Sequence, residues 1–252
     1  MSFVPAPDAL IPPLGPREEL VLLARTLWRE GYNDHLAGHI TINRGDDTLW
    51  CNPWLLHWEE LRPEHIIAID LDGNVVEPAL DGNDWPVPLG IPLHLELHRA
   101  RPDVQVAVHS HPLYATVWAD AGRIPPALDQ SSALGGGELV LVDEYEGAAN
   151  SASAAAAAVA LMGDADMALL AAHGVFVTAG SVRAAHQRAV ALEQRAERAW
   201  FATALVDGPL QSKLGPDIVT MFQRSKGEGF IGFWEAAVRA ELRADPTLLE
   251  ER

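Results

Sequence analysis

Three histidines in this sequence have the type and spacing of metal ligands. His109 and His111 follow the valine-rich segment "VQVAV" as His-Ser-His, and His173 follows the apolar run "MALLAA". Residues two apart in a strand point to the same side, so the first two imidazoles are expected side by side, where their nitrogens can reach one ion at about 2.0–2.1 Å. A third histidine from another strand would complete a site that leaves a position open for water or substrate, as catalytic metal sites do.

An ordinary structural interpretation of the same residues stays open at this point. A His-x-His pair also occurs at the edge of a sheet, and a histidine at the end of an apolar strand can be a core residue that bonds to the backbone. The residues alone therefore support either a three-histidine metal site or three unrelated histidines.

His94 and His98 form a second pair, four residues apart on the predicted helix "PLHLELHRA". Histidines at this spacing lie on one face of a helix and can share a metal ion. Glu96 lies only two residues after His94, so the segment is not a His-Glu-x-x-His motif. We expect His94 beside the metal site or facing the substrate, and His98 on the surface. From residue type and spacing alone, the other histidines are expected to be structural or solvated: His35, His39, His57, His65 and His186.

The composition argues against several classes of protein. The 252 residues include 35 acidic and 18 basic side chains, a formal charge of −17, which argues against nucleic acid or an anionic membrane surface as a partner. A single cysteine, Cys51, excludes a disulfide framework and a cysteine-rich zinc ribbon. The first fifteen residues lack a secretory signal pattern, and no apolar run approaches the roughly 20 residues of a membrane span. We expect a cytoplasmic protein.

The elements that would position the histidines alternate between strands and helices. Segments 39–43 and 48–52 flank the turn "RGDD", and 66–70 and 74–77 flank "LDG", so both pairs are predicted hairpins. Residues 78–90 are rich in Pro, Gly and Asp and are expected to form a loop. Further strands are predicted at 104–110, at 138–142 and, in two parts broken at His173, within 167–180. Helices are predicted at 16–31, 91–101, 112–122, 150–163, 181–205, 216–226 and 230–243. This alternation predicts an α/β sandwich in one domain.

On these motifs the chain resembles the class II aldolase/adducin head family. "HRARPDVQVAVHSHPLYATVWADAG" resembles the family's first metal segment, and "MALLAAHGVFVTAGSVRAAHQRAVALE" resembles its second. "LWCNPWLLHWEELRPEHIIAIDLDGNVVE" resembles the segment between the substrate loops, and "AGHITIN" resembles a glycine-containing loop of the substrate pocket. The similarity covers about residues 16–206.

The resemblance implies a fold, an assembly and a cofactor. The fold would be a three-layer α/β/α sandwich with a central, mostly antiparallel or mixed sheet, divided into a proline-rich arm (1–15), the catalytic domain (16–206) and a C-terminal helical extension (207–252). The assembly would be a homotetramer with active sites near subunit interfaces. One divalent ion per subunit, zinc first and otherwise iron, manganese, cobalt or nickel, would bind the residues that match the family's ligands, His109, His111 and His173. The ion would stabilise the enediolate that forms when a carbon–carbon bond of a small-molecule substrate breaks.

Two departures from the family's sugar-phosphate aldolases point to a different substrate. The residue that matches their catalytic glutamate is Gly90, and the pairs that match their phosphate pocket are Gly38-His39, Trp54-Leu55 and Pro88-Leu89. Large apolar groups replace small hydroxyls and exposed amides in this pocket. We therefore expect a non-phosphorylated, apolar or aromatic oxo- or hydroxy acid. The residues expected to bind it are Gly38, His39, Trp54, Leu89 and Gly90.

The reaction itself stays open between alternatives. Without a glutamate at position 90, the acid or base would be His94, Glu96 or a metal-bound water, which makes a decarboxylase as plausible as an aldolase. A non-haem iron oxygenase could use the same three histidines, and adducin-like interaction modules share the fold without chemistry. In the family the C-terminal tail often closes the site, so the segment 230–234 is expected either to form a lid or to pack against a neighbouring subunit.

Overall fold

A single mixed sheet forms the centre of the molecule. In the computed structural model, which describes residues 10–143, 151–223 and 230–250, eight strands pair in the order β4-β3-β2-β1-β5-β8-β7-β6. The strands are β1 (His39–Asn43), β2 (Thr48–Cys51), β3 (Ile67–Asp70), β4 (Val75–Glu77), β5 (Val106–Ser110), β6 (Leu139–Val142), β7 (Met167–Leu170) and β8 (Gly174–Ala179). Only β6 and β7 pair in parallel. Both predicted hairpins, β1–β2 and β3–β4, are confirmed.

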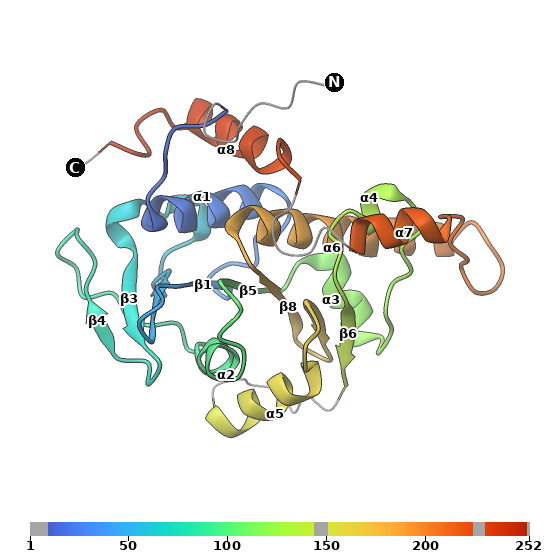
Figure 1. The fold of residues 1–252 in the computed structure, drawn as a ribbon, viewed down its shortest axis with the longest axis horizontal. Helices are drawn as coiled ribbons and strands as arrows, with labels where there is room; N and C mark the ends of the chain where they lie inside the picture. Colours follow the sequence, from blue (N-terminus) through green and yellow to red (C-terminus); the bar gives the residue numbers. More distant parts are fainter. Residues whose placement is uncertain (1–9, 144–150, 224–229, 251–252) are drawn as a thin grey trace.

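Helices cover both faces of this sheet, as Figure 1 shows. α1 (Pro16–Arg29), α3 (Leu113–Asp120) and α6 (Val182–Thr203) lie over one face, with α8 (Phe233–Ala244) packed outside α1. α2 (Pro92–Ala100) and α5 (Ala152–Met162) lie over the other. The remaining helices are the short α4 (Gln130–Ala133) and α7 (Pro216–Gln223), and the 3-10 turns Trp58–Glu60 and Pro63–His65. The predicted three-layer α/β/α sandwich is confirmed.

The hydrophobic pattern explains the two layers. On α1, Leu20, Leu23 and Leu27 recur at helical spacing and are completely buried against the sheet. On the opposite face, the alanines of α5 let this helix approach α2 closely, and Ala155 and Ala158 are buried between them. The strands between these layers are covered on both faces, and every residue of β5 is buried.

Several sequence expectations differ from the structure or lie outside its described part. The helix α4 was not predicted, because four residues capped by the side chain of Asp129 leave no periodic pattern. Residues 1–9 of the expected arm and 224–226 of an expected helix lie outside the described residues. In the tail, Trp234 is buried and packs on His186 of α6 in the same chain, whereas Ile231 and Phe233 are exposed, so a lid or a subunit contact formed by the segment 230–234 stays a prediction. The division of the chain at residues 15 and 206 stays a prediction.

Candidate metal centre

The strand order brings the three histidines to one end of the sheet. His109 is on β5, His111 follows directly after it, and His173 lies in the short turn between β7 and β8. β8 pairs with both β5 and β7, so this turn lies beside the end of β5. Gly174 permits the approach, because a Cβ there would lie 2.3 Å from Cδ2 of His111 and 2.6 Å from the Ser110 carbonyl oxygen.

The imidazole nitrogens converge closely enough to bind one ion. One ligand atom from each histidine lies within 4.8 Å of the other two, and the Nε2 atoms of His109 and His173 are 3.1 Å apart. Two nitrogens at this separation and at about 2.0–2.1 Å from a shared ion would subtend about 100° at the ion. That angle lies between the octahedral and tetrahedral values, so the spacing fits common metal geometries.

Hydrogen bonds on the far side of two rings leave the inward nitrogens free of hydrogen. Nδ1 of His109 donates to the Val175 carbonyl oxygen at 2.8 Å, and Nδ1 of His111 donates to the Asp34 carboxylate at 2.5 Å. Neutral rings that donate from Nδ1 carry a lone pair on Nε2, the form that binds metals. Among the described residues, Nε2 of His111 is buried without a hydrogen-bond partner. A divalent ion would satisfy this atom, so the residues present fit such an ion.

The electrostatics of the cluster favour neutral imidazole beside an ionised carboxylate. Burial, followed by the neighbouring His39, His173 and His111, holds the pKa of His109 well below its ordinary value. Burial raises the pKa of Asp34, but its hydrogen bonds to His111 and His35 outweigh this effect, and the net pKa is lowered. At neutral pH, Asp34 is therefore a carboxylate that orients His111 and increases its basicity as a ligand.

An apolar pocket of about 460 Å³ opens onto the cluster. Its walls combine the three histidines with Leu36, Ala37, His39, Trp54, Pro88, Leu89 and Gly90. The structure thus brings four of the residues expected to bind substrate, His39, Trp54, Leu89 and Gly90, to the clustered histidines. Gly38 is not among the lining residues: a Cβ on it would lie 2.5 Å from the Trp58 ring, and its carbonyl accepts from the Trp58 indole.

The residues expected to act as acid or base lie elsewhere. Glu96 pairs with Arg99 at 2.5 Å and does not line the pocket, so the expectation for Glu96 does not fit this geometry. His94 is completely buried and does not line the pocket. Its Nε2 bonds at 2.9 Å to Nδ1 of His39, which does line the pocket. The expectation that His98 is on the surface is wrong: His98 is buried because it lies on the side of α2 that faces β1, where it bonds to the Thr41 hydroxyl.

Sequence reasoning missed some of the residues that form the site. Asp34 is 77 residues before His111 and lies in a polar turn, "YNDH", where an aspartate is ordinary. Leu36 and Ala37, in the same segment, line the pocket. The signal that could have found them is the substrate loop "AGHITIN": Asp34 and Leu36 lie just before it, and Ala37 is its first residue.

Comparison with known proteins adds the family to this geometry. Residues 18–200 match the family described as Class II Aldolase and Adducin N-terminal domain. The chain belongs to this family. A similar relative is the 5-methylthioribulose-1-phosphate/5-deoxyribulose-1-phosphate aldolase of Rhodospirillum rubrum, 32% identical over 73% of this chain and 80% of the relative. Another is the 3,4-dihydroxyphthalate decarboxylase of Arthrobacter keyseri, 34% identical over 71% of this chain and 75% of the relative.

A solved structure of this class II aldolase/adducin family shares the whole fold. An aldolase II superfamily protein from Pseudomonas syringae aligns with a TM-score of 0.80 at 22% identity, over 93% of this chain and 97% of its own. The named relatives are an aldolase and a decarboxylase. This family member is accordingly an enzyme of the class II aldolase type, as the sequence predicts. Within the described residues, no helix is long and apolar enough to cross a membrane.

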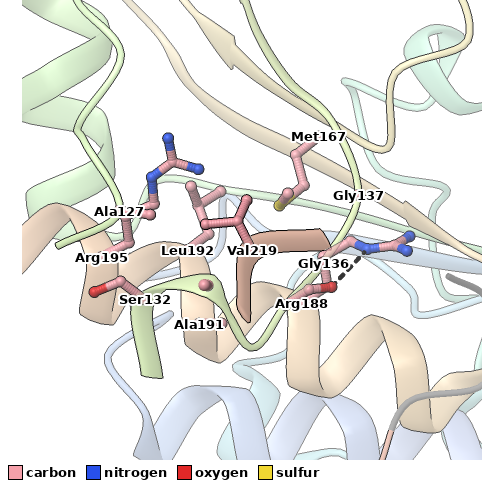
Figure 2. Close-up of a pocket in the computed structure, with 12 residues that line it drawn as sticks. Ala127, Ser132, Gly136, Gly137, Met167, Arg188, Ala191, Leu192, Arg195 and Val219 are labelled. Atoms are coloured by element: carbon pink, nitrogen blue, oxygen red, sulfur yellow. Dashed lines mark hydrogen bonds between the residues drawn. The ribbon is translucent and has the colours of Figure 1, made fainter. Parts of the chain in front are cut away.

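A second cavity in this family member is separate from the histidines. Figure 2 shows it between α4, α6 and α7, with Met167, at the opposite end of β7 from His173, on its wall. Its volume is about 60 Å³. The guanidinium of Arg188 bonds to the Gly135 carbonyl, the bond dashed in Figure 2, and to the Thr178 carbonyl. This buried arginine ties the glycine-rich loop before β6 to α6 and β8, which indicates a structural role for this region.

Proposed function

We propose that this protein is a divalent-metal-dependent lyase that cleaves a carbon–carbon bond of a non-phosphorylated, apolar or aromatic oxo- or hydroxy acid. The proposed ligands are His109, His111 and His173. The observation that supports the substrate class is the pocket wall beside them. Trp54, Pro88 and Leu89 form much of it, and among the residues that the structure describes no lysine or arginine lines it.

A phosphate group would find few hydrogen-bond donors on this wall. The backbone amide of Trp54 already donates to the Pro86 carbonyl at 2.8 Å, and Pro88 has no amide hydrogen. A phosphate dianion that loses its water shell without gaining donors is strongly disfavoured. An aromatic ring, in contrast, gains from contact with the Trp54 indole and the Leu89 side chain.

Residues of this chain would orient the metal ligands and surround the substrate. A divalent ion held there, with zinc the first candidate and iron, manganese, cobalt or nickel the others, supplies a Lewis acid that draws electron density from substrate oxygens as the bond breaks. Asp34 holds the ring of His111 in the ligand orientation. The apolar wall excludes water from the reacting carbon and strengthens the electrostatic interactions in the site.

The relatives favour different reactions, and the apolar wall of the pocket supports one of them. The Rhodospirillum relative is named for ketose 1-phosphates and the Arthrobacter relative for an aromatic dihydroxy acid. The apolar lining suits the second chemistry, so we infer a decarboxylase-type reaction before an aldol cleavage. The clustering of the three histidines also supports an enzyme over an adducin-like interaction module.

A panel of substrates tests this function. We expect carbon dioxide release from dihydroxylated aromatic acids and no cleavage of ketose 1-phosphates by the metal-loaded protein. Leu89→Asp should raise KM for the aromatic acid about tenfold or more, because a carboxylate in the pocket repels the acid. Leu80→Asp is the matched control, since both leucines are exposed on the same loop and only Leu89 lines the pocket. Cleavage of ketose 1-phosphates with no turnover of any unphosphorylated acid would overturn the proposal.

An iron oxygenase is the second candidate, because three neutral imidazoles without a carboxylate ligand suit Fe(II) as well as zinc. The two candidates differ in their consumption of oxygen. A lyase releases its products under anaerobic conditions at the same rate as in air. Substrate-dependent oxygen uptake by the Fe(II)-loaded protein, with no anaerobic turnover, would favour the oxygenase.

We also propose a homotetramer in the cytoplasm as the working form. Large apolar side chains stay exposed at the start of α3, two residues after His111, and at the end of α6, and Leu113, Phe201 and Leu205 are the most exposed of them. A patch of this kind in a water-exposed position is typical of an interface between subunits.

A further inference from the structure

The side chain of His39 fills the space beside Gly90 in the pocket wall. A Cβ added at Gly90 would lie only 2.4 Å from Nε2 of His39 and 3.0 Å from its Cε1. Both residues line the pocket, and the His39 ring lies 4.7 Å, between centroids, from that of His109. Position 90, where the sequence resemblance expects a glutamate, therefore carries no side chain, and an imidazole from β1 takes its place.

A chain of hydrogen bonds holds this imidazole from behind. Nδ1 of His39 bonds to Nε2 of His94 at 2.9 Å. The Thr41 hydroxyl bonds to Nδ1 of His94 at 2.7 Å and to Nε2 of His98 at 2.9 Å. All four side chains are at most 4% exposed. We call these four residues, His39, His94, Thr41 and His98, the buried relay.

The relay forces its histidines to share one tautomer. Thr41 has a single hydroxyl hydrogen, so it donates to one imidazole partner and accepts from the other. If it donates to His98, then His94 donates to Thr41 from Nδ1 and accepts from Nδ1 of His39. If Thr41 instead donates to Nδ1 of His94, then Nε2 of His94 donates to Nδ1 of His39, and Nε2 of His98 donates to Thr41. The three rings are therefore all protonated on Nδ1 or all protonated on Nε2.

Burial keeps the relay uncharged. It lowers the pKa of His39 and His94 well below the ordinary value, with smaller contributions from neighbouring histidines, and lowers that of His98 to about 4. The groups that face the relay from β5 and β8 are His109 and Phe176, which add no carboxylate. Neutral rings donate one hydrogen bond and accept one, as the relay requires.

We propose that His39 contacts the substrate through Nε2 and that the buried relay holds its imidazole in one tautomer. This inference rests on the proposed function for the presence of a substrate in the pocket. His39 is then the polar group that the wall offers to a substrate hydroxyl or carbonyl oxygen next to the clustered histidines. Thr41, His94 and His98 are positioning residues, because they act only through His39.

The tautomers are measurable by NMR in metal-free protein labelled with ¹⁵N-histidine, without any substrate. We expect His39, His94 and His98 to show the same tautomer near neutral pH. Thr41→Val should abolish this agreement, and Thr41→Ser should preserve it because serine keeps the hydroxyl. Thr178→Val is the matched control, since Thr178 is an equally buried threonine that bonds to a backbone carbonyl instead. A mixed set of tautomers in the unsubstituted protein would overturn the relay.

Gly90→Ala tests the packing of His39 independently. The added methyl group overlaps Nε2 of His39, so we expect Tm of the metal-free protein to fall by about 4 °C or more, which a loss of one to two kcal/mol produces at this size. In a His39→Ala background the same substitution should change Tm far less. Gly215→Ala is the control, because a Cβ there meets nothing within 4 Å. Equal effects in both backgrounds would contradict the close packing.

Turnover separates this inference from the proposed function. With an aromatic dihydroxy acid as the probe, Thr41→Val should lower kcat/KM about tenfold, the cost of one hydrogen bond, and Thr41→Ser should restore it. An unchanged kcat/KM in Thr41→Val, alongside altered tautomers, would overturn substrate contact by His39. If the unsubstituted protein turns over no acid of the panel, the proposed function fails, whereas the tautomer and Tm results still decide the relay.

Discussion

Two of the clustered histidines, His109 and His111, depend on partners that the sequence does not reveal. The types and spacing of His109, His111 and His173 pointed to a metal site as one of two interpretations, and the family resemblance favoured it because these residues match the family's ligands. Asp34 could not be found in this way, since its contact with His111 joins residues 77 positions apart. The role of His39 also depends on packing, because only the structure places its ring against Gly90.

Removal of the Asp34 carboxylate should weaken metal binding while the three histidines remain. We expect Asp34→Ala to lower the affinity for zinc about 10–100-fold, because the orientation and tautomer of His111 are no longer held. The measurement is competition with a chromophoric chelator. Asp46→Ala, in the exposed turn between β1 and β2, is the control and should bind as the unsubstituted protein does. Equal affinities for the two variants would contradict this role of Asp34.

At the scale of elements, hydrophobic periodicity was sufficient for most helices and strands. It failed at His98, because this polar side chain lies on the sheet-facing side of α2 and bonds to Thr41, while the solvent side carries Arg99 and Ala100. It also does not reveal long-range anchors. Glu193 of α6 accepts the amides of Tyr114 and Ala115 at 2.8 and 2.9 Å, so α6 caps the helix that begins just after His111.

The contact between α6 and α8 contains a buried histidine that destabilises the fold in acid. Among the described residues, neither ring nitrogen of His186 has a hydrogen-bond partner, and burial lowers its pKa to about 4. An unfolded histidine takes up its proton near pH 6.5, so this residue reduces stability as the pH falls from about 6.5 to about 4.

His186→Leu should therefore raise the free energy of unfolding by about 1–3 kcal/mol at neutral pH and reduce its decline between pH 6.5 and 4. Urea unfolding at several pH values measures both effects. Gln211→Leu, at an exposed position outside α6 and α8, should change neither. A less stable His186→Leu protein with the same decline in acid would show that this imidazole has a partner that stabilises it.

At the scale of the whole molecule, the exposed apolar patch near the cluster predicts an assembly. Leu113, Phe201 and Leu205 are 65%, 57% and 84% exposed, and the rings of Tyr114 and Phe201 lie 5.9 Å apart, which joins the start of α3 to the end of α6. The homotetramer is expected from the family resemblance alone, whereas the alternation of strands and helices was sufficient to predict the fold class. The patch could not be read from the sequence, because its members come from separate helices.

Phe201→Asp should dissociate the proposed tetramer, because a carboxylate in an apolar interface loses its water without gaining a partner. Sedimentation velocity at micromolar concentration measures the species present. Leu161→Asp, at a half-exposed leucine on α5, should leave the assembly intact. A monomeric unsubstituted protein, or a tetramer that Phe201→Asp does not affect, would contradict the proposed interface.

The number of metal ions bound per chain is the most direct measure of whether His109, His111 and His173 hold a divalent ion. The protein, purified after exposure to zinc and dialysis, should contain about one ion per chain, and His111→Ala should contain almost none. His57→Ala, a histidine outside the cluster, should retain the full amount. Folded but metal-free unsubstituted protein, or full metal content in His111→Ala, would contradict a metal site formed by these three histidines.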